Sequence, residues 1–238
     1  MVKKLPKKFF IRESNEIVDA THVLGLSEIR VIQLCLAKYW TREGLKEDKF
    51  YEIPLKEYAK IFNIENHSAY EALLEVCTTL KQKLIILNTT LINPSARKTA
   101  KTIISWVDRI DYDPKDSCIK IRWHRDIIPF FNNFGADNPY SKYYLENTRY
   151  MKSIYSIRLF RVLNKWLKLG KFEISIIELK RLLGIDEGKY SQYDNFRRKV
   201  LLPALKEIET YSDIEADFIS NSDRNITDLV FRIRKKDG

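Results

Sequence analysis

A chain of 238 residues with 45% apolar and 31% charged residues is long enough to bury a large core and too apolar to stay disordered. Lysine and arginine outnumber aspartate and glutamate by 42 to 32, so the net charge of +10 attracts polyanions, nucleic acid first among them. No stretch approaches the ~18 apolar residues of a membrane span, and three widely spaced cysteines do not indicate a disulfide framework, so a reducing cytoplasm is expected.

The first predicted segment is a basic arm over residues 1–12. It carries Lys3, Lys4, Lys7 and Lys8, and no apolar signal-peptide core follows it. The arm either seeks DNA phosphates or is a disordered, solubilising tail, and the sequence leaves both roles open.

A weak internal repeat predicts two domains. Residues 50–64 align without a gap on residues 171–185, with identical residues such as Glu52 and Glu173. Both segments have the pattern of a short strand that runs into a helix.

The segments around each copy of the repeat match as well. Apolar residues at helical spacing predict a long helix over 27–40 in the first unit and over 156–168 in the second. Ser68 and Ser191 then look like helix starts, where the hydroxyl group caps early backbone N–H groups. Each unit is therefore expected to run helix, strand, helix, helix.

Strand-like segments close each unit: 84–88, 102–110 and 118–123 in the first, and 214–219 and 228–234 in the second. This order is that of a winged helix, in which the third helix enters the major groove of DNA. The expected fold class is α+β, with two tandem winged-helix domains that are rich in helix and carry a small antiparallel β-ribbon. Winged helices also serve as protein-interaction modules, so the order alone does not establish DNA binding.

The boundary between the domains is expected inside residues 132–147, which contain glycine, proline and several asparagines. This places winged-helix domain 1 at 13–135 and winged-helix domain 2 at 136–238. Domain 2 is expected to be the main sequence-specific reader of DNA.

The third helix of domain 2, at about residues 191–210, separates into an apolar and a polar side at ~100° per residue. The apolar side comprises Phe196, Val200, Leu201, Ala204, Leu205 and Ile208. The polar side comprises Ser191, Asn195, Arg198, Lys199 and Lys206. Asparagine pairs bidentately with adenine and arginine with guanine, and the helix N-terminus suits a phosphate. The candidate DNA-binding residues of domain 2 are therefore Lys189, Ser191, Gln192, Asn195, Arg197, Arg198 and Lys199.

Two residues of this helix have open interpretations. Arg197 projects toward the apolar side, so it either clamps a phosphate or pairs with an internal carboxylate. Pro203 lacks a backbone donor, which predicts a kink or an earlier end of the helix. The cationic run 197–199 can also be an ordinary solvated face.

The corresponding helix of domain 1, at about residues 68–82, is a poorer DNA reader. Its core-spaced residues are Tyr70, Leu73, Leu74, Cys77 and Leu80. Its exposed side includes Glu71 and Glu75, and carboxylates repel phosphates. The remaining DNA-binding candidates of domain 1 are Ser68, Lys81, Lys83, Arg97, Lys98 and Lys101. Domain 1 is expected to contribute backbone contacts through its wing, a protein interface, or both.

The C-terminal part of the sequence resembles the initiator replication proteins of theta-replicating, iteron-containing plasmids. The resemblance is carried by residues 156–185 and 189–208, where the pattern includes Phe196, Arg197, Arg198, Val200, Leu201, Pro203, Ala204 and Ile208. The opening segment, residues 11–36, is similar to the start of these proteins as well.

The resemblance implies a bacterial, cytoplasmic protein that binds direct repeats of an origin, called iterons, in double-stranded DNA. It implies a monomer that starts replication, in equilibrium with a homodimer that represses its own gene, with domain 1 forming much of the dimer interface. It also implies the host initiator and the replicative helicase as partners, a role in plasmid copy control, and no contact with a membrane.

Two other classes of protein were weighed. A rolling-circle nicking enzyme needs paired metal-binding histidines, but His22, His67 and His124 are far apart. No GxxxxGK[ST] loop is present either, so neither an enzymatic activity, a cofactor nor a metal is expected. A winged-helix transcription regulator would share every feature above and would differ only in its DNA target.

Overall fold

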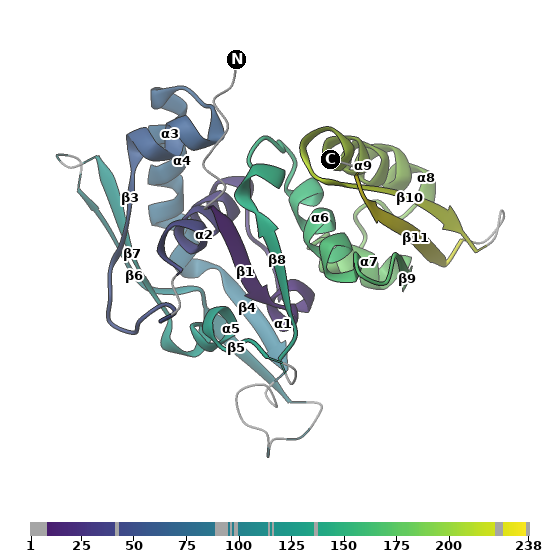
Figure 1. The fold of residues 1–238 in the computed structure, drawn as a ribbon, viewed down its shortest axis with the longest axis horizontal. Coiled ribbons are helices and arrows are strands. Elements are labelled where there is room, and N and C mark those ends of the chain that lie inside the picture. Colours follow the sequence, from purple (N-terminus) through teal and green to yellow (C-terminus); the bar gives the residue numbers. More distant parts are fainter. Residues whose placement is uncertain are drawn as a thin grey trace. The chain divides into compact units, whose positions relative to one another are not determined.

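The computed structural model describes residues 9–40, 43–88, 95, 97, 100–113, 115, 117–135, 138–221 and 226–236. The chain divides into two units, Met1–Leu145 and Glu146–Gly238, and Figure 1 labels their elements. None of the helices formed by the described residues has the length and apolar character needed to cross a bilayer.

Unit 1 contains short and long helices and three small antiparallel sheets. Its helices are α1 (Asn15–Asp19), α2 (Leu26–Tyr39), α3 (Leu55–Phe62), α4 (Asn66–Thr79) and α5 (Pro129–Asn132), with 3₁₀ turns at Leu80–Gln82 and Arg125–Ile127. Its strands are β1 (Phe10–Ser14), β2 (Thr21–His22), β3 (Tyr51–Pro54), β4 (Leu84–Asn88), β5 (Lys101–Ser105), β6 (Val107–Asp113), β7 (Cys118–Trp123) and β8 (Tyr140–Tyr144). The sheets have the strand orders β1-β8, β2-β4-β5 and β3-β7-β6.

Unit 2 follows a 3₁₀ turn at Leu145–Asn147 and repeats the plan of helix, strand, helix, helix and ribbon. Its elements are α6 (Ile154–Trp166), β9 (Lys171–Ser175), α7 (Ile176–Leu182), α8 (Tyr193–Phe196), the π-helical segment η5 (Arg197–Leu201), α9 (Leu202–Tyr211), β10 (Ile214–Ser220) and β11 (Asp228–Lys235). The three strands form one antiparallel sheet in the order β10-β11-β9. The predicted α+β class with two tandem winged-helix domains is confirmed.

The core of unit 1 is built around α2, which is buried from Glu28 to Ala37. Glu28 is the least usual residue there, because a buried carboxylate needs partners. The backbone N–H of Gly25 and the hydroxyl of Thr79 each donate to it at 2.5 Å. Glu28 therefore ties the start of α2 to the end of α4.

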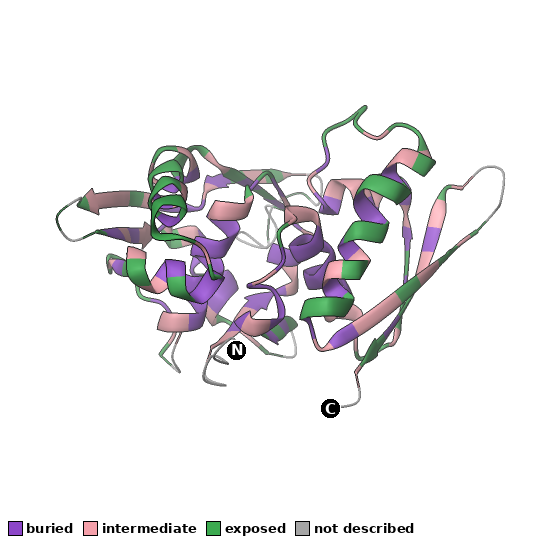
Figure 2. Ribbon diagram, turned by 90° about the horizontal axis from the view of Figure 1, so that it is seen from above, coloured by how far each residue is buried: buried purple, intermediate pink, exposed green. Residues whose placement is uncertain are grey.

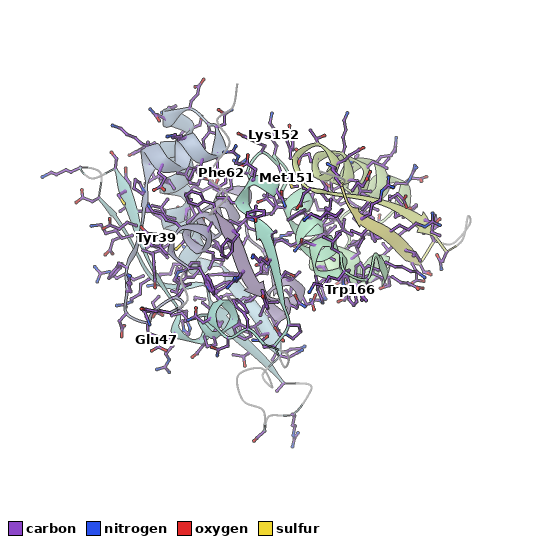
Figure 3. The ribbon with its side chains drawn as sticks, viewed as in Figure 1. Tyr39, Glu47, Phe62, Met151, Lys152 and Trp166 are labelled. Atoms are coloured by element: carbon purple, nitrogen blue, oxygen red, sulfur yellow. The ribbon has the colours of Figure 1, made fainter. Side chains whose placement is uncertain are left out.

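The core of unit 2 lies between α6 and the inner face of the sheet. Phe218, Phe231 and Phe172 stand opposite one another on the three strands, because their register places them on one face. Trp166, at the end of α6, stacks on Phe172 with 5.0 Å between ring centroids (Figure 3). This aromatic row anchors the ribbon to the helices.

The two units divide at 145/146, which lies inside the segment 132–147 where the boundary is expected and ten residues after the expected end of domain 1 at residue 135. The reason is β8, which falls in the segment taken for a linker and pairs with β1. Ile11 and Tyr143 face the core from this pair, and the Tyr143 hydroxyl donates to Glu13 at 3.1 Å. The same pairing makes residues 10–12 part of the fold, whereas Lys3, Lys4, Lys7 and Lys8 lie outside the described residues.

The strand predicted over 102–110 is two strands in different sheets. The break is at Trp106, whose side chain is buried and meets the ring of His22 at 5.3 Å. β5 pairs with β4, while β6 pairs with β7. The chain thus changes sheets at the residue that enters the core.

Both predicted helix starts were misplaced. α4 begins at Asn66 with Glu65 as its N-cap, so Ser68 lies inside the first turn. α8 begins at Tyr193 with Gln192 as its N-cap, so Ser191 lies outside the helix. Neither N-cap makes a side-chain capping bond, and the serine signature was therefore misleading at both sites.

Candidate nucleic-acid interface

The third helix of unit 2 is continuous from Tyr193 to Tyr211, and we call it the composite helix. It consists of α8, the π-helical segment η5 and α9. The π turn accommodates Pro203, which has no N–H and whose ring would clash with the carbonyl one α-helical turn back. In this turn Leu202 donates its N–H to the Arg197 carbonyl, five residues earlier. The helix therefore does not end early, and the irregularity expected from Pro203 takes the form of a π turn.

The apolar side of the composite helix is buried as predicted. Phe196, Val200, Leu201, Ala204 and Ile208 are each at most 1% exposed. Leu205 is half-buried. Burial of one large apolar side chain contributes roughly 1.5–3 kcal/mol, so this face fixes the helix firmly to unit 2. Figure 2 shows the resulting contrast between buried and exposed residues along the helix.

The opposite side of its first turns carries a polar row formed by Gln192, Asn195 and Arg198. Arg198 Nη2 donates to Asn195 Oδ1 at 3.4 Å, and Asn195 Nδ2 donates to Gln192 Oε1 at 3.2 Å. Gln192 and Arg198 are exposed and Asn195 is half-buried. Lys199 is exposed beside the row. Amide and guanidinium groups held in a line on a helix surface match the donors and acceptors of base edges.

Arg197 lies apart from the polar row, in a groove of about 710 Å³ between the composite helix and β10. The groove is lined by Tyr193, Asp194, Arg197, Leu202, Leu205, Ile226 and residues 216–220. Arg197 is itself exposed. It shares the groove with two exposed carboxylates, Asp194 and Asp217. The role of Arg197 therefore stays a prediction.

The loop before the composite helix is held by three contacts. Tyr190 has a φ of 54°, a left-handed conformation that costs free energy outside glycine. Lys180 Nζ donates to the Tyr190 carbonyl at 2.7 Å, and the Tyr190 ring meets Tyr155 edge-on at 6.5 Å. Lys189 donates to the Tyr155 hydroxyl at 3.3 Å, which raises the pKa of Lys189. Lys189 therefore stays charged next to the polar row, and Ser191 is exposed between them.

The third helix of unit 1 buries only part of the predicted face: Leu73 and Leu80 are buried as predicted, and Cys77 is half-buried. Its buried residues are Ala69, Leu73 and Val76, and Leu80 follows in the 3₁₀ turn. Tyr70 and Leu74, which were expected in the core, are each 40% exposed. The helix packs through a narrow stripe that includes a small alanine, and Tyr70 instead meets Tyr112 of β6 at 6.1 Å.

The acidic surface of α4 is present as expected, because Glu71 and Glu75 are exposed. The cationic candidates around it have mixed surroundings. Lys83 lies 4.0 Å from the buried Glu28, so it partly serves the fold, whereas Lys81 is exposed. Lys101 donates to Asn88 across the β4–β5 pair at 2.5 Å.

The remaining candidates of unit 1 are Ser68, Arg97 and Lys98. Ser68 and Arg97 are exposed, and Lys98 lies outside the described residues. Lys56 and Lys60, which are not among the predicted residues, line a groove of about 590 Å³ between α3 and α4 together with Asn63 and Glu65. The signal was available, since this turn joins the second and third helices of the winged helix. No group of three or more His, Cys, Asp or Glu side chains among the residues that the structure describes could hold a metal ion.

The sequence and structure were compared with known proteins. Residues 10–164 match the family model "Initiator Replication protein, WH1", and residues 175–233 match "Initiator Rep protein, WH2". The "PI protein" of Escherichia coli is 28% identical, with 87% of this chain and 76% of that protein covered. A "Replication initiation protein" of Escherichia coli is 22% identical, with 93% and 68% covered.

A solved structure shares the fold. The Pi initiator protein, crystallised in complex with iteron DNA, matches with a TM-score of 0.83 at 24% sequence identity, and the match covers 98% of this chain and 100% of that chain. The two family models together span most of the sequence, in the order of units 1 and 2. The chain belongs to the initiator replication protein family, whose two winged-helix domains it carries in tandem.

Proposed function

We propose that this protein is a plasmid replication initiator that binds iterons in double-stranded DNA through the composite helix of unit 2. The observation that carries the proposal is the polar row of Gln192, Asn195 and Arg198, which lies at the surface of a helix whose other side is almost completely buried. Gln192 and Arg198 are exposed, and Asn195 is half-buried. A helix anchored in this way presents its amide and guanidinium groups without a large entropic cost on binding. The complex of the related Pi protein with iteron DNA supports the same reading.

Other residues supply the sequence-independent part of binding. Lys189, Lys199 and Ser191 surround the polar row and are placed to contact phosphates, which fix register but carry no sequence information. In unit 1, Lys81, Lys101, Arg97 and Ser68 are exposed candidates for backbone contacts. Unit 2 is thus the main reader, and unit 1 assists it.

The protein forms a homodimer in equilibrium with the monomer, and the dimer represses its own gene. The outer face of the β2-β4-β5 sheet supports this part of the proposal. Leu84, Ile86 and Ile103 are 49%, 38% and 57% exposed there, and Ile86 lies directly opposite Ile103. An apolar patch on a sheet face marks an interaction surface. Recruitment of the host initiator and the replicative helicase rests on membership of the family alone.

A binding series on three duplexes tests the proposal: direct repeats from DNA flanking the gene, the same half-sites inverted, and a shuffled sequence. Monomers should bind the direct repeats with an affinity that falls steeply with salt concentration. Dimeric binding to the inverted sites alone would favour a transcription regulator. Equal affinity for all three duplexes would overturn specific recognition.

A further inference from the structure

The hydrogen bonds of the polar row define how the amide of Asn195 is turned. Its Oδ1 faces Arg198, toward the C-terminal end of the helix, and its Nδ2 faces Gln192, toward the N-terminal end. The row therefore runs from acceptor to donor along the helix in this arrangement.

The same bonds leave enough capacity to read a base. An amide oxygen accepts two hydrogen bonds and an amide nitrogen donates two, so Asn195 keeps one of each after bonding both neighbours. Adenine presents N7 as an acceptor and N6 as a donor in the major groove, which matches this pair. Arg198 uses one of its five donors on Asn195, and two of the others can reach guanine O6 and N7 together.

The spacing of the two residues sets the spacing of the bases. Three residues along an α-helix rise by ~4.5 Å, while consecutive base pairs are ~3.4 Å apart along the DNA axis. We propose that Asn195 and Arg198 act as one hydrogen-bonded reading pair that recognises an adenine and a guanine on neighbouring base pairs. This inference rests on the proposed function and adds the identity and adjacency of two target bases.

Arg197 provides an internal contrast. It carries the same charge and is exposed, but it lines the groove beside β10 and not the polar row. Its removal should weaken binding to every duplex to a similar extent. Arg197→Ala is therefore the matched control for Arg198→Ala.

The experiment measures the affinity of the full chain for its direct repeat and for duplexes with each base pair substituted in turn. The proteins are the unmodified chain, Asn195→Ala, Arg198→Ala, the double variant and Arg197→Ala. Each single variant of the pair should lose roughly 10- to 100-fold in affinity, the range expected for one bidentate base contact. Because the two residues hold each other, the double variant should lose less than the product of the two single losses, by about fivefold or more.

Base preference supplies the second readout. Asn195→Ala should abolish the preference for adenine at one position, and Arg198→Ala should abolish the preference for guanine at the next. Arg198→Lys should keep the charge and the salt dependence but lose the guanine preference, since lysine lacks the planar fork. Thermal melting checks that each variant folds, and any unfolded alanine variant is replaced by Asn195→Ser or Arg198→Lys.

The possible failures are distinguishable. Absence of any sequence preference in the unmodified chain would remove the proposed function itself. If the protein binds specifically but the affinity losses of Asn195→Ala and Arg198→Ala multiply in the double variant, the reading pair is overturned. The same holds if the two variants lose base preference at base pairs that are not neighbours. Either result would leave the proposed function standing.

Discussion

Several arginines of unit 2 serve the fold and not a ligand. Arg149, Arg158 and Arg161 are 2%, 3% and 4% exposed. Arg149 pairs with Glu146 at 2.7 Å, and Arg158 donates to the Leu183 carbonyl at 2.6 Å. The net charge of +10 therefore overstates the charge available for DNA. Exposed cations of unit 2 include Lys189, Arg198 and Lys199 at the polar row.

Arg158→Ala should lower the free energy of unfolding by about 2–4 kcal/mol, because it removes a charged hydrogen bond and leaves the Leu183 carbonyl unsatisfied. Lys168→Ala, at an exposed position after α6, should change it by less than about 0.5 kcal/mol. Urea unfolding followed by circular dichroism measures both. Equal effects of the two substitutions would contradict the assigned role of Arg158.

Burial also gives unit 1 a predictable response to alkali. Burial raises the pKa of Cys35 from 9.0 to about 12 and that of Tyr58 from 10.0 to about 12. The folded chain thus keeps protons that the unfolded chain releases. Their contribution to stability is complete below about pH 9 and declines as the pH rises toward 12. Urea midpoints at pH 8 and pH 10.5 should differ less for Cys35→Ala than for the unmodified chain, and an unchanged difference would argue against a protonated, buried thiol.

At the scale of elements, the sequence predicted what depends on local pattern. The strand-to-helix repeat, the helix at 27–40 and the strand at 84–88 all correspond to observed elements. These elements could be predicted because the spacing of apolar residues along a short segment distinguishes a strand from a helix. The pairing of β1 with β8 was missed because its partners are more than a hundred residues apart. The buried face of α4 was predicted only in part, since Leu73 is buried but Tyr70 and Leu74 are exposed, because the neighbouring elements decide which apolar residues of the helix are covered.

The exposed side of the composite helix could also be predicted from local sequence pattern. The apolar residues from Phe196 to Ile208 define the buried side, so the exposed side follows without tertiary information. The π turn at Arg197–Leu201 could not be foreseen, because Pro203 is equally compatible with a kink or a helix end.

A further element contact links the composite helix to the start of α6. The carboxylate of Glu207 accepts from the backbone N–H groups of Lys152 at 3.0 Å and Ser153 at 3.2 Å (Figure 3 labels Lys152). Glu207→Ala should cost about 1–2 kcal/mol of stability, since it removes an anion from a helix N-terminus. Glu207→Gln should cost less, because its amide oxygen still accepts. Lys206→Ala is the exposed neighbour used as the control, and an equal effect of all three changes in a thermal melt would refute the link.

At the scale of the whole molecule, the two units divide the work. Unit 2 exposes the polar row, whereas unit 1 exposes an acidic α4 and an apolar sheet face. This division fits the proposal that one surface binds DNA and another binds a second copy of the chain. Fold alone does not determine function, so each surface requires its own test.

The proposed dimer surface is tested by Ile103→Glu, which places a charge at the most exposed residue of the three in the patch. Sedimentation analysis should show a shift to monomer by at least tenfold in the dissociation constant, because a buried, unpaired carboxylate is strongly unfavourable. Ile177→Glu, at an 83% exposed isoleucine of unit 2, should leave the dissociation constant unchanged. If Ile103→Glu leaves the dimer unchanged, the dimer interface lies on another surface of the protein.

Methylation protection of guanine N7 in the bound repeat tests the central claim most directly, because this atom lies in the major groove where Arg198 is expected to donate. In the complex with the unmodified chain, at least one guanine should be protected. The same guanine should become reactive in the complex with Arg198→Ala and stay protected with Arg197→Ala, at protein concentrations that saturate the DNA. Guanines that remain fully reactive under the bound, unmodified protein, or protection that survives Arg198→Ala, would contradict base reading by the composite helix.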